Sequence, residues 1–295
     1  MFLYEKLKNI LKKPKIKMVV IGNCQSRPLA AIFNVLNPNI EIISIAIVHL
    51  LQTHQYEEYR SAFEQADFII AQSVSDNYSC EFVRTYFLEA HYKKKLINIL
   101  NLYYTGYTPD WVYIRTKNRQ PLKGPMGDYH NETIFDGWKT GLAIEETVRR
   151  LEDPTYNQIY ANAGTESLQE LQKREKAVDV KIVDYMVQEL QKERLFFTIN
   201  HPSHKLLEEY AKRILHHCKI PIKNNHVAFK DEPLGQFKPR VNPIVVMDEI
   251  NESHHYGIEF SIAAPMQAGI RKKKYTSTEI ASLFYQLYDN NKEQL

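Results

Sequence analysis

The first hundred residues alternate short apolar runs with amphipathic runs, and this alternation restricts the fold more than any other feature. The apolar runs predict strands over 16–21, 40–48, 67–72 and 96–100, with a fifth strand over 195–199. The runs between them predict helices over 28–36, 55–65 and 80–94. Strands that alternate with helices indicate a parallel sheet, and nearly continuous apolar strands indicate that both of its faces are covered. We therefore predict an α/β fold with a doubly wound, mainly parallel sheet of about five strands.

The length of 295 residues suits one α/β domain with insertions, or two domains. The pattern predicts a basic amphipathic arm, a first part of the α/β core, a largely helical insertion with a loop, the last strand and helix of the core, and a C-terminal extension. These segments are expected over 1–15, 16–102, 103–194, 195–222 and 223–295, in that order. The insertion is the expected lid or acceptor region.

Three stretches in the second half carry more specific expectations. Residues 103–140 are rich in tyrosine, glycine and proline and lack periodicity, which is typical of a functional loop or lid. Residues 165–193 place apolar side chains at helical spacing, which predicts one long helix with a core-facing stripe. The sequence Thr276-Ser277-Thr278-Glu279 has capping-box spacing and predicts the start of a last helix.

Composition disfavours several classes of protein. The net charge is +3, and basic residues do not gather with aromatics in a recognisable motif, which disfavours nucleic-acid binding. No apolar run approaches the roughly eighteen residues that would cross a bilayer. Cys24, Cys80 and Cys218 are an odd number and widely spaced, so they predict no disulfide framework. They fit a reducing cytoplasm, where a lone thiol can serve chemistry.

The N-terminal arm has two interpretations. Residues 1–15 place apolar side chains at helical spacing among lysines, without the cleavage site of a signal peptide. Such a segment can lie on an anionic surface, which would make the protein peripheral at the inner face of a membrane. It can equally be a short helix that packs on its own domain.

Polar side chains follow every predicted strand, at the edge where doubly wound sheets bind ligands. In strand order they are Asn23, Cys24, Gln25 and Arg27; His49; Gln72, Ser73 and Asp76; Asn101, Tyr103 and Tyr104; and Asn200, His201 and His204. A thiol and imidazoles at the same edge predict a site for group transfer.

Cys24 stands where the chain turns from the first strand into a helix that begins near 26–28. The thiolate is the reactive form of cysteine, and a helix N-terminus favours negative charge. Arg27 would act in the same direction if it points inward, and the Gln25 N–H or the Asn23 amide could face an oxyanion. A partly ionised nucleophile is therefore expected. The structural alternative is an inert small hydrophobe.

His201 is the preferred proton acceptor for that thiol, because it ends a strand and is fixed by the following Pro202. Asn200, Asp76 and His204 are all open as the third group that orients the imidazole. His201 and His204 could instead cap the next helix. Their spacing lacks the pattern of a zinc protease, so no metal is expected.

Three stretches together resemble the WcbI-type capsular polysaccharide biosynthesis family. They are the turn Gly22-Asn23-Cys24-Gln25, the segment "YYTGYTPDWVY" and the segment "FFTINHPSHKLL", and the resemblance covers roughly 17 to 215. It implies coenzyme A or acetyl-coenzyme A as a substrate, with Cys24 against the pantetheine thiol and His201 as the base. The residues expected to bind the cofactor are Gly22, Asn23, Gln25, Ser26, Arg27, Gln72, Asn200 and His204.

There is also a distant likeness to the SGNH hydrolases, whose first strand ends in Gly-Asp-Ser. Gly22-Asn23-Cys24 would hold that register, which favours an SGNH- or flavodoxin-like architecture. Cysteine replaces the serine and the late Asp-x-x-His block is missing, so plain ester hydrolysis is disfavoured.

The leading hypothesis is transfer of an acyl group, expected to be acetyl, from coenzyme A to a hydroxyl of a capsular or other surface sugar. Cys24 could carry the acyl group, or His201 could deprotonate the hydroxyl for direct attack. The alternatives are a thiol-dependent esterase or thioesterase, and a non-catalytic coenzyme A- or sugar-binding component of a polysaccharide assembly system. The tyrosines of 103–140 would suit a carbohydrate acceptor, or serve packing alone.

Overall fold

The computed structural model describes residues 14–245, 252–261 and 271–295. They divide into two compact units, which are described separately. The first unit takes residues up to 101 together with 174–182 and 207–228, and the second takes 102–173, 183–206 and 229–295. The expectation for the N-terminal arm falls on residues 1–13, which lie outside the described residues. Within the described ranges, no helix has the length and apolar character needed to cross a membrane.

A parallel four-stranded sheet forms the centre of the first unit. Its strands are β1 (Ile16–Gly22), β2 (Ile40–Ile47), β3 (Phe68–Gln72) and β4 (Leu96–Ile99), in the order β2-β1-β3-β4. Its helices are α2 (Ser26–Leu36), α3 (Tyr56–Gln65), α4 (Thr85–Tyr92) and the part of α9 (His204–His217) from Leu207 onward. The predicted α/β fold with a parallel sheet is confirmed.

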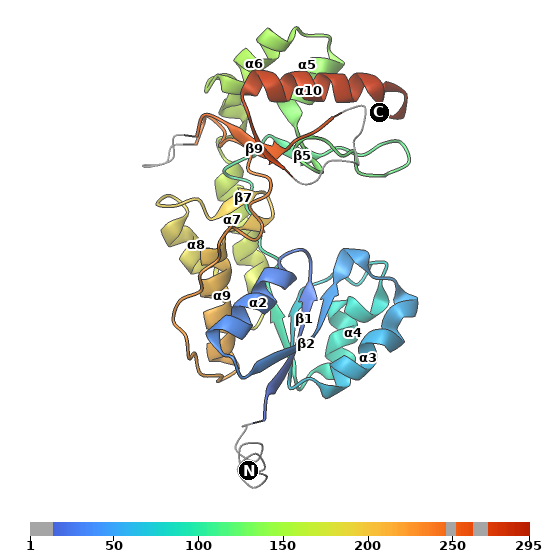
Figure 1. The fold of residues 1–295 in the computed structure, drawn as a ribbon, viewed down its shortest axis with the longest axis vertical. Helices are drawn as coiled ribbons and strands as arrows, with labels where there is room; N and C mark the ends of the chain where they lie inside the picture. Colours follow the sequence, from blue (N-terminus) through green and yellow to red (C-terminus); the bar gives the residue numbers. More distant parts are fainter. Residues whose placement is uncertain (1–13, 246–251, 262–270) are drawn as a thin grey trace, which may run out of the picture. The chain divides into compact units, whose positions relative to one another are not determined.

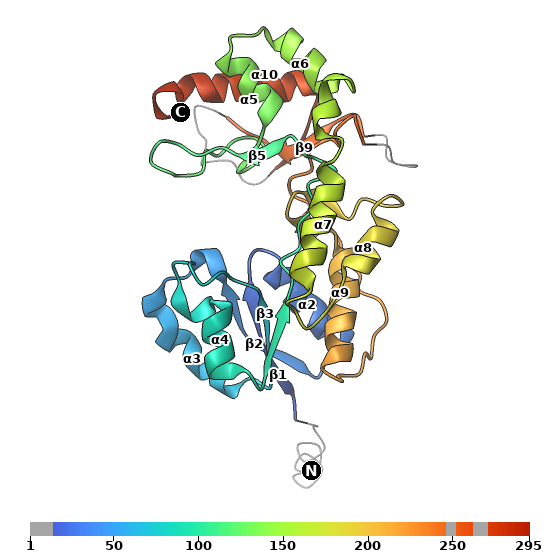
Figure 2. The same cartoon turned by 180° about the vertical axis from the view of Figure 1, so that it is seen from behind.

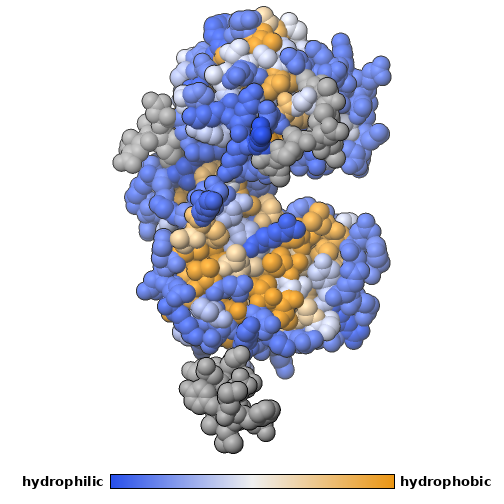
Figure 3. All heavy atoms as spheres, in the orientation of Figure 1, coloured by the Kyte–Doolittle hydropathy of each residue, from blue (hydrophilic) through white to orange (hydrophobic). Residues whose placement is uncertain are grey.

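Helices cover both faces of this sheet, as the apolar strands require. Figures 1 and 2 show α3 and α4 on one face and α2 and α9 on the other. Val19 and Ile21 of β1 pack with Phe63 and Phe82 from the α3 and α4 side, and all four are fully buried. The edge strand β2 is less covered, because residues 41–45 are only half-buried. Figure 3 shows apolar side chains gathered on the side of the first unit that this view presents.

The strand order places a topological switch point at β1. The chain passes from β1 to β2 on one side and then returns to β3 on the other side of β1. In doubly wound sheets this reversal opens a crevice at the carboxyl ends of the two inner strands, and ligands bind there. The carboxyl ends of β1 and β3 are therefore the place to look for a site.

The predicted fifth strand is wrong. Among the described residues, β7 (Phe196–Thr198) pairs antiparallel with β8 (His201–Pro202) as a separate hairpin in the second unit. The buried Arg194 guanidinium donates to the carbonyls of Phe196 and Phe197 and pairs with Glu252. These contacts satisfy the backbone carbonyls of Phe196 and Phe197 outside the central sheet. The apolar run over 195–199 therefore does not have to pair with a strand of that sheet.

The predicted single helix over 165–193 is also wrong, since the chain forms α7 (Ala163–Glu175) and α8 (Val183–Glu189). Between them, Asp179 N donates to Asn98 O at 2.9 Å, and Asn98 N donates to Asp179 Oδ2 at 2.7 Å. This pairing with the end strand β4 draws the segment out of helical geometry. The apolar stripe does face the core, because Leu171, Ile182 and Met186 are fully buried.

Residues 103–140 contribute buried side chains to the core of the second unit, and their role as a lid or acceptor region stays a prediction. They contain β5 (Trp111–Tyr113), β6 (Tyr129–Asn131) and α5 (Glu132–Lys139), and Tyr107 is buried. The other elements of the second unit are α6 (Ile144–Glu152), β9 (His255–Ile258), β10 (Lys272–Tyr275) and α10 (Ser277–Asn290). Within the described ranges, the 3-10 helices are Val48–Leu50, Thr53–Gln55, Glu81–Val83, Tyr156–Tyr160 and Lys292–Gln294. The capping box of α10 is confirmed, with Glu279 N donating to Thr276 Oγ1 at 3.2 Å.

Candidate functional site

The turn between β1 and α2 presents Asn23 and Cys24 at the carboxyl edge of the sheet. Gly22 ends the strand, and its lack of a side chain is required there. A Cβ at this position would lie 2.5 Å from Gln72 Oε1 and 2.6 Å from Ser26 Oγ. Asn23 Oδ1 accepts from Gln25 N at 3.0 Å, which closes the turn before α2 begins at Ser26.

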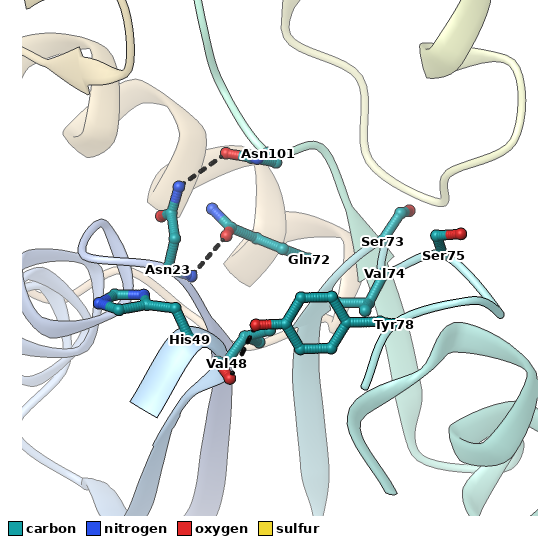
Figure 4. Close-up of a pocket in the computed structure, with 9 residues that line it drawn as sticks. All are labelled: Asn23, Val48, His49, Gln72, Ser73, Val74, Ser75, Tyr78 and Asn101. Atoms are coloured by element: carbon teal, nitrogen blue, oxygen red, sulfur yellow. Dashed lines mark hydrogen bonds between the residues drawn. The ribbon is translucent and has the colours of Figure 1, made fainter. Parts of the chain in front are cut away.

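A network of carboxamides fixes this turn to the neighbouring strand ends. Asn23 N donates to Gln72 Oε1 at 2.8 Å, and Gln72 Nε2 donates to Gln25 Oε1 at 2.9 Å. Asn23 Nδ2 donates to Asn101 Oδ1 at 2.9 Å. Figure 4 shows the two bonds that join Asn23 to Gln72 and Asn101. The turn is thus held from β1, β3 and the segment after β4, all within the first unit.

Cys24 is partly buried, and this burial raises the pKa of its thiol. The N–H groups of Cys24 and Gln25 act in the opposite direction, but more weakly. At neutral pH the thiol is therefore protonated, and the expectation of a partly ionised sulfur is wrong. The loss of water around the sulfur raises the pKa of the thiol more than the N–H groups at the start of α2 lower it.

The other predicted residues of the turn differ in exposure. Ser26 is buried, and its Oγ has no hydrogen-bond partner in the described part of the chain. Arg27 is exposed to solvent. Asp76, considered as an orienting group, is also exposed and does not line the pocket described next.

A pocket of about 280 Å³ opens beside the turn, at the predicted edge of the sheet. Its lining residues all belong to the first unit: Asn23, Val48, His49, Gln72, Ser73, Val74, Ser75, Tyr78 and Asn101. Figure 4 shows His49 from the segment after β2 and Tyr78 from the segment after β3. The sequence indicated His49, Ser73 and Asn101 as strand-end residues but gave them no role. The sequence did not reveal that β1 and β2 are neighbours in the sheet. This pairing places Gly22 opposite Ile47, two residues before His49, and so brings His49 to the turn.

The remaining predicted residues, Asn200, His201 and His204, lie in the second unit. Tyr129 Oη donates to Asn200 Oδ1 and lies 3.2 Å from His201 Nε2. Burial lowers the pKa of His201 to about 4, so this imidazole is neutral at pH 7. His204 N and Nδ1 contact Glu232 at 2.9 and 2.6 Å, so the Glu232 carboxylate caps the first turn of α9.

A family model described as "Polysaccharide biosynthesis enzyme WcbI" matches residues 17–223. The chain belongs to the WcbI family. The fold agrees with this assignment: a solved WcbI structure has a TM-score of 0.73 to this chain at 18% identity, covering 94% of this chain and 96% of that one. That protein is described as a novel polysaccharide biosynthesis enzyme, in a native form without a disulfide bond between coenzyme A and a cysteine. No protein of curated function matches the sequence.

Membership of the WcbI family makes this chain an enzyme of polysaccharide biosynthesis. The matched range contains the whole four-stranded sheet and the Cys24 turn, and it ends shortly after α9. The pairing of Cys24 with His201 stays a prediction, because the two residues belong to different units. Within the described ranges, no three histidine, cysteine, aspartate or glutamate side chains gather in a way that could hold a metal ion.

Proposed function

We propose that this WcbI-family enzyme is a coenzyme A-dependent acyltransferase, which moves an acyl group, expected to be acetyl, to a sugar hydroxyl of a surface or capsular polysaccharide. One observation carries the proposal. Cys24 stands on a rigid turn at the switch point of the sheet, next to a pocket with a hydrogen-bonding lining. The description of the WcbI neighbour, which names coenzyme A together with a cysteine, supports the choice of cofactor.

The protonated thiol of Cys24 favours direct transfer over an acyl-cysteine intermediate. A thiol must lose its proton before it attacks a thioester, and burial opposes that loss here. In direct transfer the sugar hydroxyl attacks the thioester carbonyl, and Cys24 contacts the pantetheine end of the cofactor. The same raised pKa disfavours a thiol-dependent esterase or thioesterase, which would need the thiolate as nucleophile.

Contact between Cys24 and the cofactor thiol can be tested by disulfide exchange. At alkaline pH over several hours, base removes the proton of the Cys24 thiol, and the thiolate is expected to attack coenzyme A disulfide, so that one Cys24–coenzyme A disulfide forms and one coenzyme A thiolate leaves. Intact-protein mass spectrometry should show this adduct on the wild type and none on Cys24→Ser. Cys218→Ser is the matched control, because Cys218 is another partly exposed thiol of the first unit.

The chemistry is tested by incubation with acetyl-coenzyme A under reducing conditions. Calorimetry should show that acetyl-coenzyme A binds, while the mass of the wild type stays unchanged. A stable acetyl adduct on Cys24 would overturn direct transfer and support the covalent route. Failure of the wild type to bind acetyl-coenzyme A would overturn the proposed function itself.

A further inference from the structure

The lining of the pocket beside the Cys24 turn lacks carboxylate, ammonium and guanidinium side chains. It contains no aspartate, glutamate, lysine or arginine among its nine residues. Phosphate and carboxylate groups are usually bound by arginine, lysine or other strong donors, so this lining does not suit them. Its volume of about 280 Å³ is just below the roughly 300–1,000 Å³ of sites for drug-sized ligands. It therefore suits one uncharged ring or a short chain.

Three polar groups of the pocket have no hydrogen-bond partner among the described residues. They are the His49 imidazole, the Ser73 hydroxyl and the Asn101 amide nitrogen. By contrast, the carboxamide of Gln72 already bonds to the turn through both of its ends. The three unpaired groups supply both donors and acceptors around one space, which matches the hydroxyl groups of a sugar.

The rest of the pocket wall is apolar or aromatic. Val48 and Val74 line it with Tyr78, whose hydroxyl donates to Val48 O at 3.3 Å and so fixes the ring. Figure 4 shows the Tyr78 ring across the pocket from Asn23. A sugar ring has C–H faces and hydroxyl edges, and an aromatic face beside polar side chains complements both.

We propose that this pocket binds an uncharged sugar ring of the acyl acceptor, and that His49 accepts the proton of the hydroxyl that is acylated. This inference rests on the proposed acyltransferase function. It identifies an acceptor site and a base within the first unit. His49 suits the role because it is exposed and has no hydrogen-bond partner among the described residues, so a ligand can reach its ring nitrogens.

The step balances without any further reactant. The hydroxyl O–H bond breaks and its proton passes to the His49 imidazole, while the oxygen attacks the thioester carbonyl carbon. The new C–O bond forms, the C–S bond breaks, and coenzyme A leaves as a thiolate. The imidazolium returns its proton to that thiolate. The products are the O-acyl sugar and coenzyme A with a free thiol.

Sugar binding is tested by saturation-transfer NMR with methyl glucoside, methyl galactoside and methyl mannoside at millimolar concentration, and glucuronate as the charged comparison. At least one methyl glycoside should receive saturation from the wild type, and glucuronate should not. Ser73→Leu should abolish the signal, because leucine fills the pocket and removes one free hydroxyl. Ser79→Leu, the same change at an exposed serine outside the pocket, should leave it intact.

Three NMR outcomes would contradict the pocket assignment. One is an equal signal from Ser73→Leu, and another is a stronger signal for glucuronate. The third is displacement of the glycoside by free pantetheine, which would place the cofactor arm in the pocket.

The role of His49 is tested by the rate of acetyl transfer from acetyl-coenzyme A to the glycoside that binds. His49→Gln keeps the size and one hydrogen-bonding end, but it cannot accept a proton. The rate should fall by roughly 10²–10⁴-fold with unchanged coenzyme A binding. His54→Gln changes an exposed histidine outside the pocket and should retain the wild-type rate. A wild-type rate in His49→Gln would overturn the assignment, whereas a wild type without any transfer would instead overturn the proposed function.

Discussion

At the scale of single residues, Gln72 is the side chain on which the geometry of the Cys24 turn depends. It is buried, accepts from Asn23 N and donates to Gln25 Oε1. Gln72→Leu keeps the volume but leaves both partners unsatisfied, so it should destabilise the protein by about 1–3 kcal/mol and weaken coenzyme A binding. Urea unfolding and calorimetry would measure these effects. Gln65→Leu, at an exposed glutamine of α3, should stay within about 0.5 kcal/mol of the wild type. Equal effects of the two changes would refute this role.

The sequence was sufficient to identify the residues of this turn but not their electrostatics. Gly22, Asn23 and Gln25 were expected at the site from the strand-to-helix transition, and Gln72 from its strand end. The pKa of Cys24 could not be predicted, because it depends on how much water the packed turn removes from the sulfur. His49 was visible only as a polar residue after a strand, since the β2-β1 pairing that brings it to Asn23 is a tertiary contact.

At the scale of elements, those set by local sequence were predicted correctly, and those changed by contacts between distant residues were not. The four strands of the central sheet were predicted from their apolar runs. The start of α10 was predicted from a capping box whose two members, Thr276 and Glu279, are only three residues apart. The run over 195–199 looks like the other strands, but the buried Arg194 that holds it in a hairpin contacts residues far along the chain, such as Glu252. Likewise, no local signal revealed that Asp179 would pair with Asn98 and divide the predicted long helix.

The cap of α10 allows a prediction at this scale. Thr276→Ala removes the acceptor of Glu279 N and should lower the free energy of unfolding of the second unit by about 0.5–2 kcal/mol. Thr278→Ala makes the same change in the first turn of the helix without removing a cap and should have a smaller effect. Trp111 and Trp138 both lie in the second unit, so tryptophan fluorescence during urea unfolding reports on it. A larger loss in Thr278→Ala would contradict the capping assignment.

At the scale of the whole molecule, the described histidines with strongly lowered pKa values all lie in the second unit. Burial lowers the pKa of His130 and of His201 to about 4, and that of His255 to about 3. The neutral His130 ring is satisfied on both sides, with Leu122 O 2.8 Å from Nε2 and Tyr288 Oη 2.9 Å from Nδ1. Arg240 and Arg194 further oppose protonation of His255.

These shifts predict that acid destabilises the second unit. In the unfolded chain a histidine has its ordinary pKa of about 6.5 and binds a proton more readily than in the folded protein. The free energy of unfolding therefore decreases as the pH falls below about 6.5 toward 4. Between pH 7 and 5, fully buried His130 should remove roughly 1–2 kcal/mol from the free energy of unfolding. Urea titrations at both pH values, followed by tryptophan fluorescence, should show this loss. His130→Gln should reduce the difference between the two pH values, while exposed His54→Gln should not. If His130→Gln kept the full difference, protonation of this ring would not be the cause, and the acid sensitivity would have to come from other groups.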